Sequence, residues 1–90
     1  MAQADDSDTD ARRARAHDVL VRLHAACGGS VEREVSFSRA ATDIGLDYLG
    51  TRSVLGTMLQ ERWIVRHGRD AVTLTPHGID EAIRLASTRD

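Results

Sequence analysis

Two short runs with the alternating pattern of β-strands lie between segments with helical periodicity, and this order restricts the fold more than any other feature. Residues 63–67 and 71–75 flank Gly68, Arg69 and Asp70. A three-residue connection that contains glycine suits a β-hairpin. Because a chain of 90 residues builds one compact core, the hairpin and the helices must share it. We therefore expect one α+β domain that is mainly helical.

The first third of the chain predicts a long helix behind an acidic tail. Apolar residues with helical spacing define one buried stripe, which runs through Ala16, Leu20, Leu23 and Cys27. Gly28 and Gly29 end this helix. Residues 1–10 carry four aspartates and almost nothing apolar, so we expect a disordered acidic N-terminal tail that ends in a helix cap at Asp10. The folded domain is then expected over residues 11–90.

The middle and the end of the chain add three more helices and one strand. Residues 31–37 mostly alternate between apolar and polar, which predicts a short strand. Ser38 is placed to cap a short helix over residues 39–44, and Asp47 is placed to cap a longer third helix. Thr75 is placed to cap a last helix after the hairpin. The expected order is helix, short strand, helix, helix, strand, strand, helix.

Composition and charge narrow the classes of function. No stretch is long and apolar enough to span a bilayer, and the N-terminus lacks the pattern of a secretory signal, so we expect a cytoplasmic protein. The formal net charge is -2, but residues 11–90 carry twelve arginines against ten acidic residues. The predicted domain is therefore mildly basic.

Patterns typical of catalysis are absent from the sequence, which has no lysine, no glycine-rich phosphate loop, no Gly-x-Ser-x-Gly and no His-Glu-x-x-His. His17, His24 and Cys27 fall on one broad face of the first helix, and a His-x-x-Cys pair can share Zn²⁺. However, no second cysteine completes a tetrahedral set, and Cys27 also fits the core stripe. We expect no enzymatic activity, no cofactor and no metal; a metal-sensing regulator is the alternative.

Four segments between Ile44 and Ala82 form a recurring pattern of turn, helix, hairpin and helix. They are Gly45-Leu46-Asp47, Leu55-Gly56-Thr57-Met58, Gln60-Glu61-Arg62-Trp63-Ile64 and Leu74-Thr75-Pro76-His77-Gly78-Ile79-Asp80-Glu81-Ala82. Together they resemble the second half of winged helix-turn-helix domains, and MarR-like and PadR-like regulators are the nearest families. The Leu-Thr-Pro-x-Gly segment is the most specific part of the resemblance. The glycine that is usual before the aromatic residue is replaced by Arg62.

This resemblance implies a three-helix core, a β-hairpin wing over residues 64–75 and a C-terminal helix. It also implies sequence-specific binding of double-stranded DNA by a homodimeric transcriptional regulator, with the third helix in the major groove. Arg52 is the first candidate for a guanine contact, and Ser53 and Thr57 are candidates for phosphate contacts. The complete set of candidate DNA-binding residues is Tyr48, Arg52, Ser53, Thr57 and Gln60 on the third helix, and Arg66, His67 and Arg69 in the wing.

The alternative function is a winged-helix module that binds another protein and no DNA, since a fold does not determine its function. The acidic tail and the weak basic balance favour this alternative. A positive stripe that joins Arg52, Arg66 and Arg69 would favour DNA, whereas an exposed apolar patch on the third helix would favour a protein partner.

Three smaller features also have two interpretations each. Gly50 and Gly56 are unusual inside a helix. Either both let the backbone approach DNA, or Gly50 marks an irregular helix start and Gly56 marks tight helix packing. A second apolar stripe on the first helix is either a dimer interface or a set of scattered surface residues, and it consists of Ala14, Val21 and Ala25. An arginine cluster near the start of that helix is either solvated or an extension of the phosphate contacts, and it consists of Arg12, Arg13 and Arg15.

Overall fold

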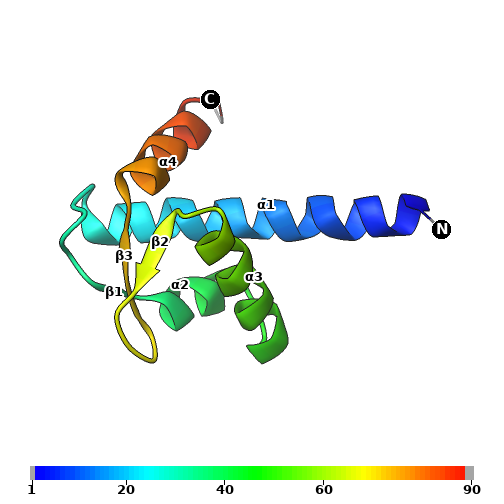
Figure 1. Ribbon diagram of the computed structural model, residues 1–90, viewed down its shortest axis with the longest axis horizontal. Coiled ribbons are helices and arrows are strands. Elements are labelled where there is room, and N and C mark those ends of the chain that lie inside the picture. The colour runs from blue at the N-terminus through cyan, green and yellow to red at the C-terminus, as the bar shows by residue number, and fades with distance from the viewer. Residues whose placement is uncertain (1, 89–90) are drawn as a thin grey trace.

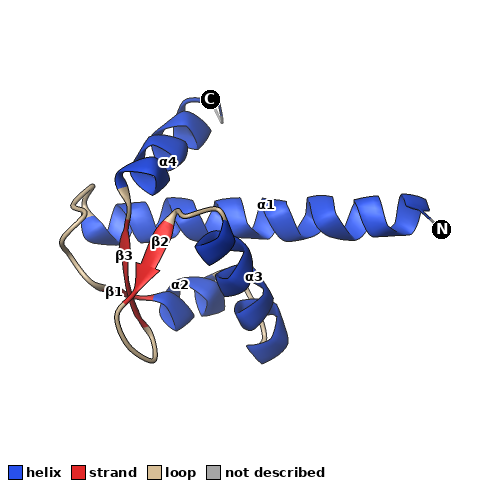
Figure 2. Cartoon of the chain, viewed as in Figure 1, coloured by secondary structure: helices blue, strands red, loops and turns tan. Residues whose placement is uncertain are grey.

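The computed structural model describes residues 2–88 of the chain, and within this range it is an α+β structure that is mostly helical. Figure 1 shows the arrangement of the elements, and Figure 2 separates helices from strands. The predicted order of elements is confirmed. The elements are α1 (Ala2–Cys27), β1 (Val35–Ser36), α2 (Phe37–Asp43), α3 (Tyr48–Gln60), β2 (Ile64–Arg66), β3 (Ala71–Leu74) and α4 (Pro76–Thr88).

The sheet of the described residues is small and antiparallel, with β3 between β1 and β2. Ile64 lies opposite Leu74 across the hairpin, and Val35 lies opposite Val72 on the other side of β3. The predicted strand over residues 31–37 is therefore reduced to two residues. Residues 31–34 are exposed and unpaired in the sheet, and the chain enters α2 at Phe37 directly after the pairing with β3.

The core lies between α1 and the remaining elements. The predicted stripe on α1 is confirmed, because each of its four residues is buried. Side chains from α2, α3, the hairpin and α4 cover it, among them Phe37, Met58, Leu74 and Ala82. Full burial of each large aliphatic side chain contributes about 1.5–3 kcal/mol, so this contact between distant segments is the main source of the domain's stability.

The start of α1 differs from the prediction. The helix begins at Ala2, so the cap predicted at Asp10 is wrong, and the backbone of residues 2–10 is helical where a disordered tail was expected. Residues 2–10 contain neither glycine nor proline, and acidic residues near a helix N-terminus complement its dipole. The N-terminal part of α1 extends beyond the other elements in Figure 1. No helix within residues 2–88 is long and apolar enough to cross a membrane, although α1 spans 26 residues.

The cap of α2 also differs from the prediction. Ser38 was expected to cap this helix, but the helix begins at Phe37 and the hydroxyl of Ser36 accepts a hydrogen bond from the amide of Arg39 at 3.3 Å. Phe37 is buried, and its packing in the core starts the helix earlier. The amide of Ser38 donates instead to the Asp70 carboxylate at 2.7 Å.

The caps of α3 and α4 are confirmed. The carboxylate of Asp47 accepts from the amide of Gly50 at 2.8 Å, and the hydroxyl of Thr75 accepts from the amide of Gly78 at 2.9 Å. Each side chain satisfies an amide that the first turn of a helix leaves without a partner. The C-terminus of α3 leads into the hairpin, and the capped N-terminus of α4 follows it directly.

The junction between the hairpin and α4 is closed by backbone contacts. The amide of Thr75 donates to the carbonyl of Trp63 at 2.9 Å, and its hydroxyl donates to the carbonyl of Arg62 at 2.6 Å. Arg62 has a φ of 62°, in the left-handed region that glycine adopts most easily. The position where the resembling families usually carry glycine thus has the backbone conformation that favours glycine.

Candidate functional site

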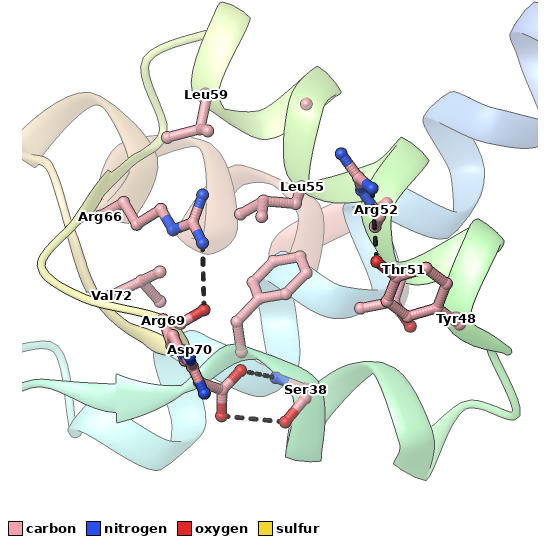
Figure 3. Close-up of a pocket in the computed structure, with 12 residues that line it drawn as sticks. Ser38, Tyr48, Thr51, Arg52, Leu55, Leu59, Arg66, Arg69, Asp70 and Val72 are labelled. Carbon is pink, nitrogen blue, oxygen red and sulfur yellow. Dashed lines mark hydrogen bonds between the residues drawn. The ribbon is translucent and has the colours of Figure 1, made fainter.

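A groove of about 680 Å³ lies between α3 and the hairpin. Figure 3 shows that its two sides come from segments that are distant in the sequence. Its apolar floor is formed by Phe37, Leu55, Leu59 and Val72. Three arginines border the groove, Arg52 from α3 and Arg66 and Arg69 from the hairpin. The structure therefore brings together the three arginines that the sequence analysis named as a possible positive stripe.

The guanidinium groups of the two hairpin arginines have different surroundings. Arg66 donates from Nε to the carbonyl of Gly68 at 2.8 Å and from Nη2 to the carbonyl of Arg69 at 3.3 Å. These two hydrogen bonds stabilise the turn of the hairpin. The guanidinium of Arg69 is exposed and makes no hydrogen bond or ion pair with the described side chains of residues 11–87 or with the described backbone. Arg69 is consequently available for an anion outside the chain.

Arg52 is held by its neighbour one helical turn earlier. Its Nη1 donates to the phenol oxygen of Tyr48 at 3.3 Å, and its Cζ lies 5.8 Å from the centre of the Tyr48 ring. Residues four apart on a helix face each other, and both side chains are exposed. Tyr48 restricts the positions of the guanidinium and leaves most of its donors available.

Asp70 joins the hairpin to the start of α2. Its carboxylate accepts hydrogen bonds from the amide of Ser38 at 2.7 Å, from the hydroxyl of Ser38 at 2.9 Å and from the hydroxyl of Ser36. Burial raises the pKa of Asp70, but the hydrogen bonds from Ser36 and Ser38 outweigh it and hold the pKa below its ordinary value. Asp70 therefore stays ionised and fixes the turn of the hairpin beside the groove.

His67 lies on the hairpin, and its ring points toward Thr73 of β3. Its Nε2 is 2.7 Å from the hydroxyl of Thr73, and its amide donates to the carbonyl of Ala71 at 2.8 Å. Thr73 is buried, so this hydrogen bond satisfies a polar group in the interior. A role in the hairpin itself accounts for His67 without an outside ligand.

The remaining predicted site residues do not border the groove. Ser53 lines a separate hollow of about 190 Å³ on the opposite side of α3, together with Arg12 and Arg15 of α1. The hydroxyl of Thr57 donates to the carbonyl of Ser53 at 3.2 Å, and Gln60 is exposed at the end of the helix. The predicted set is thus divided between the two sides of α3, and each side carries arginines.

The two glycines of α3 have different environments. A Cβ on Gly50 would lie 3.1 Å from Oδ1 of Asp47 and 3.3 Å from Cδ2 of Leu46, so Gly50 fits the tight start of the helix. A Cβ on Gly56 would meet no atom within 4 Å. Tight helix packing was one interpretation of Gly56, and it is wrong, because the open surface of α3 lies above this residue.

The sequence analysis did not single out Leu49, which is the most exposed of the large hydrophobic residues in the described part of the chain. Its side chain is 74% exposed, and that of the adjacent Tyr48 is 71% exposed. The available signal was the spacing of the inward residues of α3, which leaves Leu49 on the outer side of the first turn.

His17 and Cys27 of α1 both have packing partners within the domain. Cys27 is buried, and its Sγ lies 3.4 Å from the carbonyl of His24, to which it donates. His17 lies 5.5 Å from the Trp63 ring and 3.7 Å from the Glu81 carboxylate. Burial lowers the pKa of His17, and this outweighs the opposite effect of Glu81. Among the side chains that the structure describes, those of residues 11–87, there is no cluster of three or more histidine, cysteine, aspartate or glutamate residues with the geometry of a metal site.

Comparison with known proteins identifies no relative of this chain: no family model, no curated protein and no solved structure matches it.

Proposed function

We propose that this chain is a winged helix-turn-helix domain of a cytoplasmic transcriptional regulator, which binds double-stranded DNA with α3 in the major groove. The hairpin over residues 64–75 serves as the wing. The order of the elements and the antiparallel pairing of the hairpin with β1 support this assignment. The resemblance of residues 44–82 to such domains supports it independently.

The observation that carries the proposal is the placement of arginines on both sides of α3. Arg52, Arg66 and Arg69 border the groove on one side, and Arg12 and Arg15 border the hollow on the other. A helix in the major groove lies between two phosphate backbones. Cations along both sides of an exposed helix match this arrangement.

The charges assign a different role to each part of the surface. Arg69 has no partner in the described residues and would contact a phosphate, as would Arg12 and Arg15. Arg52 lies in the N-terminal half of α3, which is the part of a recognition helix that reaches base edges. Tyr48 is then a positioning residue for Arg52, since its phenol oxygen accepts from the guanidinium.

A symmetric homodimer is part of the proposal, because two copies double a weak positive charge and match two half-sites. The surface on which α1 and α4 meet offers apolar residues for such an interface. Ile83 of α4 is 50% exposed. Ala14 and Val21 of α1 border a shallow hollow with Leu85 of α4.

A protein-binding module is the second candidate, and the exposure of Tyr48 and Leu49 favours it. Two adjacent large apolar side chains on one helix end are suited to a partner protein. This candidate assigns no role to Arg69 or to the arginines beside Ser53.

The test is a titration of the purified protein against random-sequence duplex DNA at several salt concentrations, with the solution mass measured in parallel. Binding that weakens steeply with salt, by a species of twice the chain mass, would support the proposal, because each phosphate contact releases counterions. Absence of binding at low salt would contradict it and favour the protein-binding module.

A further inference from the structure

The outer surface of α3 has one feature that the phosphate contacts leave unexplained. Leu49 is the most exposed large hydrophobic residue among residues 11–87, and it borders neither the groove nor the hollow beside α3. With 3.6 residues per turn, it lies on the helix surface between Arg52 on one side and Ser53 on the other. A single exposed leucine is ordinary on a protein surface. Its position at the centre of the proposed reading surface is what makes it informative.

The neighbours of Leu49 on this face are Arg52 and Gly56. These residues follow Leu49 by three and seven positions, so all three lie on one face of the helix. Gly56 has no atom within 4 Å of the position of a Cβ. The face thus has two projecting side chains at its N-terminal end and a bare backbone one turn later, which allows a close approach of another surface.

The chemistry of the two projecting side chains differs, and each has one counterpart in the major groove. A guanidinium pairs with the O6 and N7 acceptors of guanine, and the apolar group that B-DNA presents there is the 5-methyl of thymine. A leucine can exclude water from that methyl group, whereas it cannot satisfy the polar edges of the other bases.

We propose that Leu49 and Arg52 read neighbouring base pairs, with Leu49 contacting the methyl group of a thymine and Arg52 contacting a guanine, while Gly56 lets α3 lie deep in the major groove of the DNA. This inference rests on the proposed DNA-binding function. Three residues of helix rise about 4.5 Å, and base pairs are stacked about 3.4 Å apart. The thymine and the guanine therefore lie one or two base pairs apart in the same half-site.

The experiment selects preferred duplexes from a random pool with the wild-type protein and then replaces each thymine of the selected site by deoxyuridine, which lacks only the methyl group. We expect one replacement close to a guanine to weaken binding about fourfold, which is the effect of one buried methyl group. The same replacement should have no effect on binding by Leu49→Ala. Val31→Ala is the matched control, because Val31 is 42% exposed and lies in the loop after α1; this variant should keep the full effect.

The outcomes separate the inference from the proposed function. A protein that binds no duplex would overturn the proposed function, and the inference with it. A protein that selects a defined site, but is insensitive to every thymine methyl group, would overturn the inference alone. A methyl effect that persists in Leu49→Ala would also overturn it, since another residue would then make the contact.

Discussion

Gly78 of α4 lies against the backbone of Trp63, and the two residues are in contact because glycine has no Cβ. A Cβ on Gly78 would lie 2.9 Å from the carbonyl carbon of Trp63, 3.0 Å from its Cα and closer still to its carbonyl oxygen. The same carbonyl accepts the amide of Thr75. The Thr-Pro-x-Gly segment therefore combines a helix cap with a close crossing of two backbones. This contact joins the first turn of α4 to the residue that precedes β2.

The first prediction concerns this contact. Gly78→Ala should lower the free energy of unfolding by about 3 kcal/mol, at the upper end of the usual cost of overpacking, because backbone atoms cannot move aside like a flexible side chain. Urea unfolding followed by the fluorescence of Trp63 measures the change. A loss of less than about 0.5 kcal/mol, the size usual for surface substitutions, would show that α4 does not cross the Trp63 backbone this closely.

The second prediction concerns Gly56, a helical glycine that, unlike Gly78, has open space where a Cβ would lie. Gly56→Ala should raise the free energy of unfolding by about 1 kcal/mol, since alanine has the higher helix propensity and the new Cβ meets no atom. Affinity for the selected duplex should fall in the same variant if the bare backbone faces DNA. Stability from urea unfolding and affinity from fluorescence anisotropy would thus change in opposite directions. Unchanged affinity would argue against a close approach of α3 at this residue.

The third prediction concerns the left-handed residue after α3. Arg62→Gly should raise the free energy of unfolding by about 0.5–1 kcal/mol. The substitution removes a left-handed conformation that costs a non-glycine residue about 1–2 kcal/mol, and part of this gain is offset by the larger entropy of glycine in the unfolded chain. Arg33→Gly is the matched control, because Arg33 lies in an exposed loop and has a negative φ. If Arg33→Gly gained as much stability as Arg62→Gly, the effect would come from the loss of a positive charge and not from the backbone conformation.

The fourth prediction is a pH dependence at Asp70. Its pKa is held below the ordinary value of 3.8 in the folded state, so it contributes stability above that value and loses the contribution as the pH falls through the folded pKa. Asp70→Asn should lower the free energy of unfolding by about 1 kcal/mol at pH 7, as expected for a weakened helix cap. The difference between wild type and variant should shrink between about pH 5 and pH 2.

Glu34→Gln is the control for this series, since Glu34 is exposed in the loop before β1. Thermal unfolding of the three proteins across the pH range gives the comparison. A wild-type advantage that stayed constant down to pH 2 would mean that the charge of Asp70 is not what stabilises the start of α2.

The fifth prediction separates the two proposed classes of DNA contact. Arg69→Ala should weaken binding to all duplexes alike and reduce the salt slope by about 1, as one lost phosphate contact requires. Arg52→Ala should relax the sequence preference and cost about 1–3 kcal/mol on the preferred site. Arg33→Ala removes the same charge at a residue that lines neither the groove nor the hollow, and it should change neither quantity. Equal behaviour of the Arg52 and Arg33 variants would show that α3 presents a different face to DNA.

Local signals in the sequence were sufficient to predict the helices and strands and some of the residues at which they begin or end. The caps at Asp47 and Thr75 were predicted because the side chain of a cap bonds an amide two or three residues later. The cap of α2 was misplaced because the burial of Phe37 and the bonding of Ser38 to Asp70 depend on segments more than 30 residues away. A pattern confined to one segment carries no information on such partners.

In the candidate site, too, local spacing predicted some features and the packing of distant segments decided the others. The spacing of inward residues correctly placed Tyr48 and Arg52 on the exposed side of α3, but it grouped Ser53 with them. The structure separates Ser53 from Arg52, because α1 passes on one side of α3 and the hairpin on the other. Leu49 was overlooked because an apolar residue is usually expected to face the core, although the spacing of the inward residues of α3 leaves it on the outer side of the helix.

The sequence by itself determined the kinds of elements, their order and the buried face of α1, because helical and strand periodicities and capping side chains act within a few residues along the chain. Only the tertiary structure decided that Gly78 must lack a side chain, that Asp70 holds the start of α2, and that Arg52 shares a groove with Arg66 and Arg69. These relationships arise where segments far apart in the chain pack against one another, and packing is a property of the folded core as a whole.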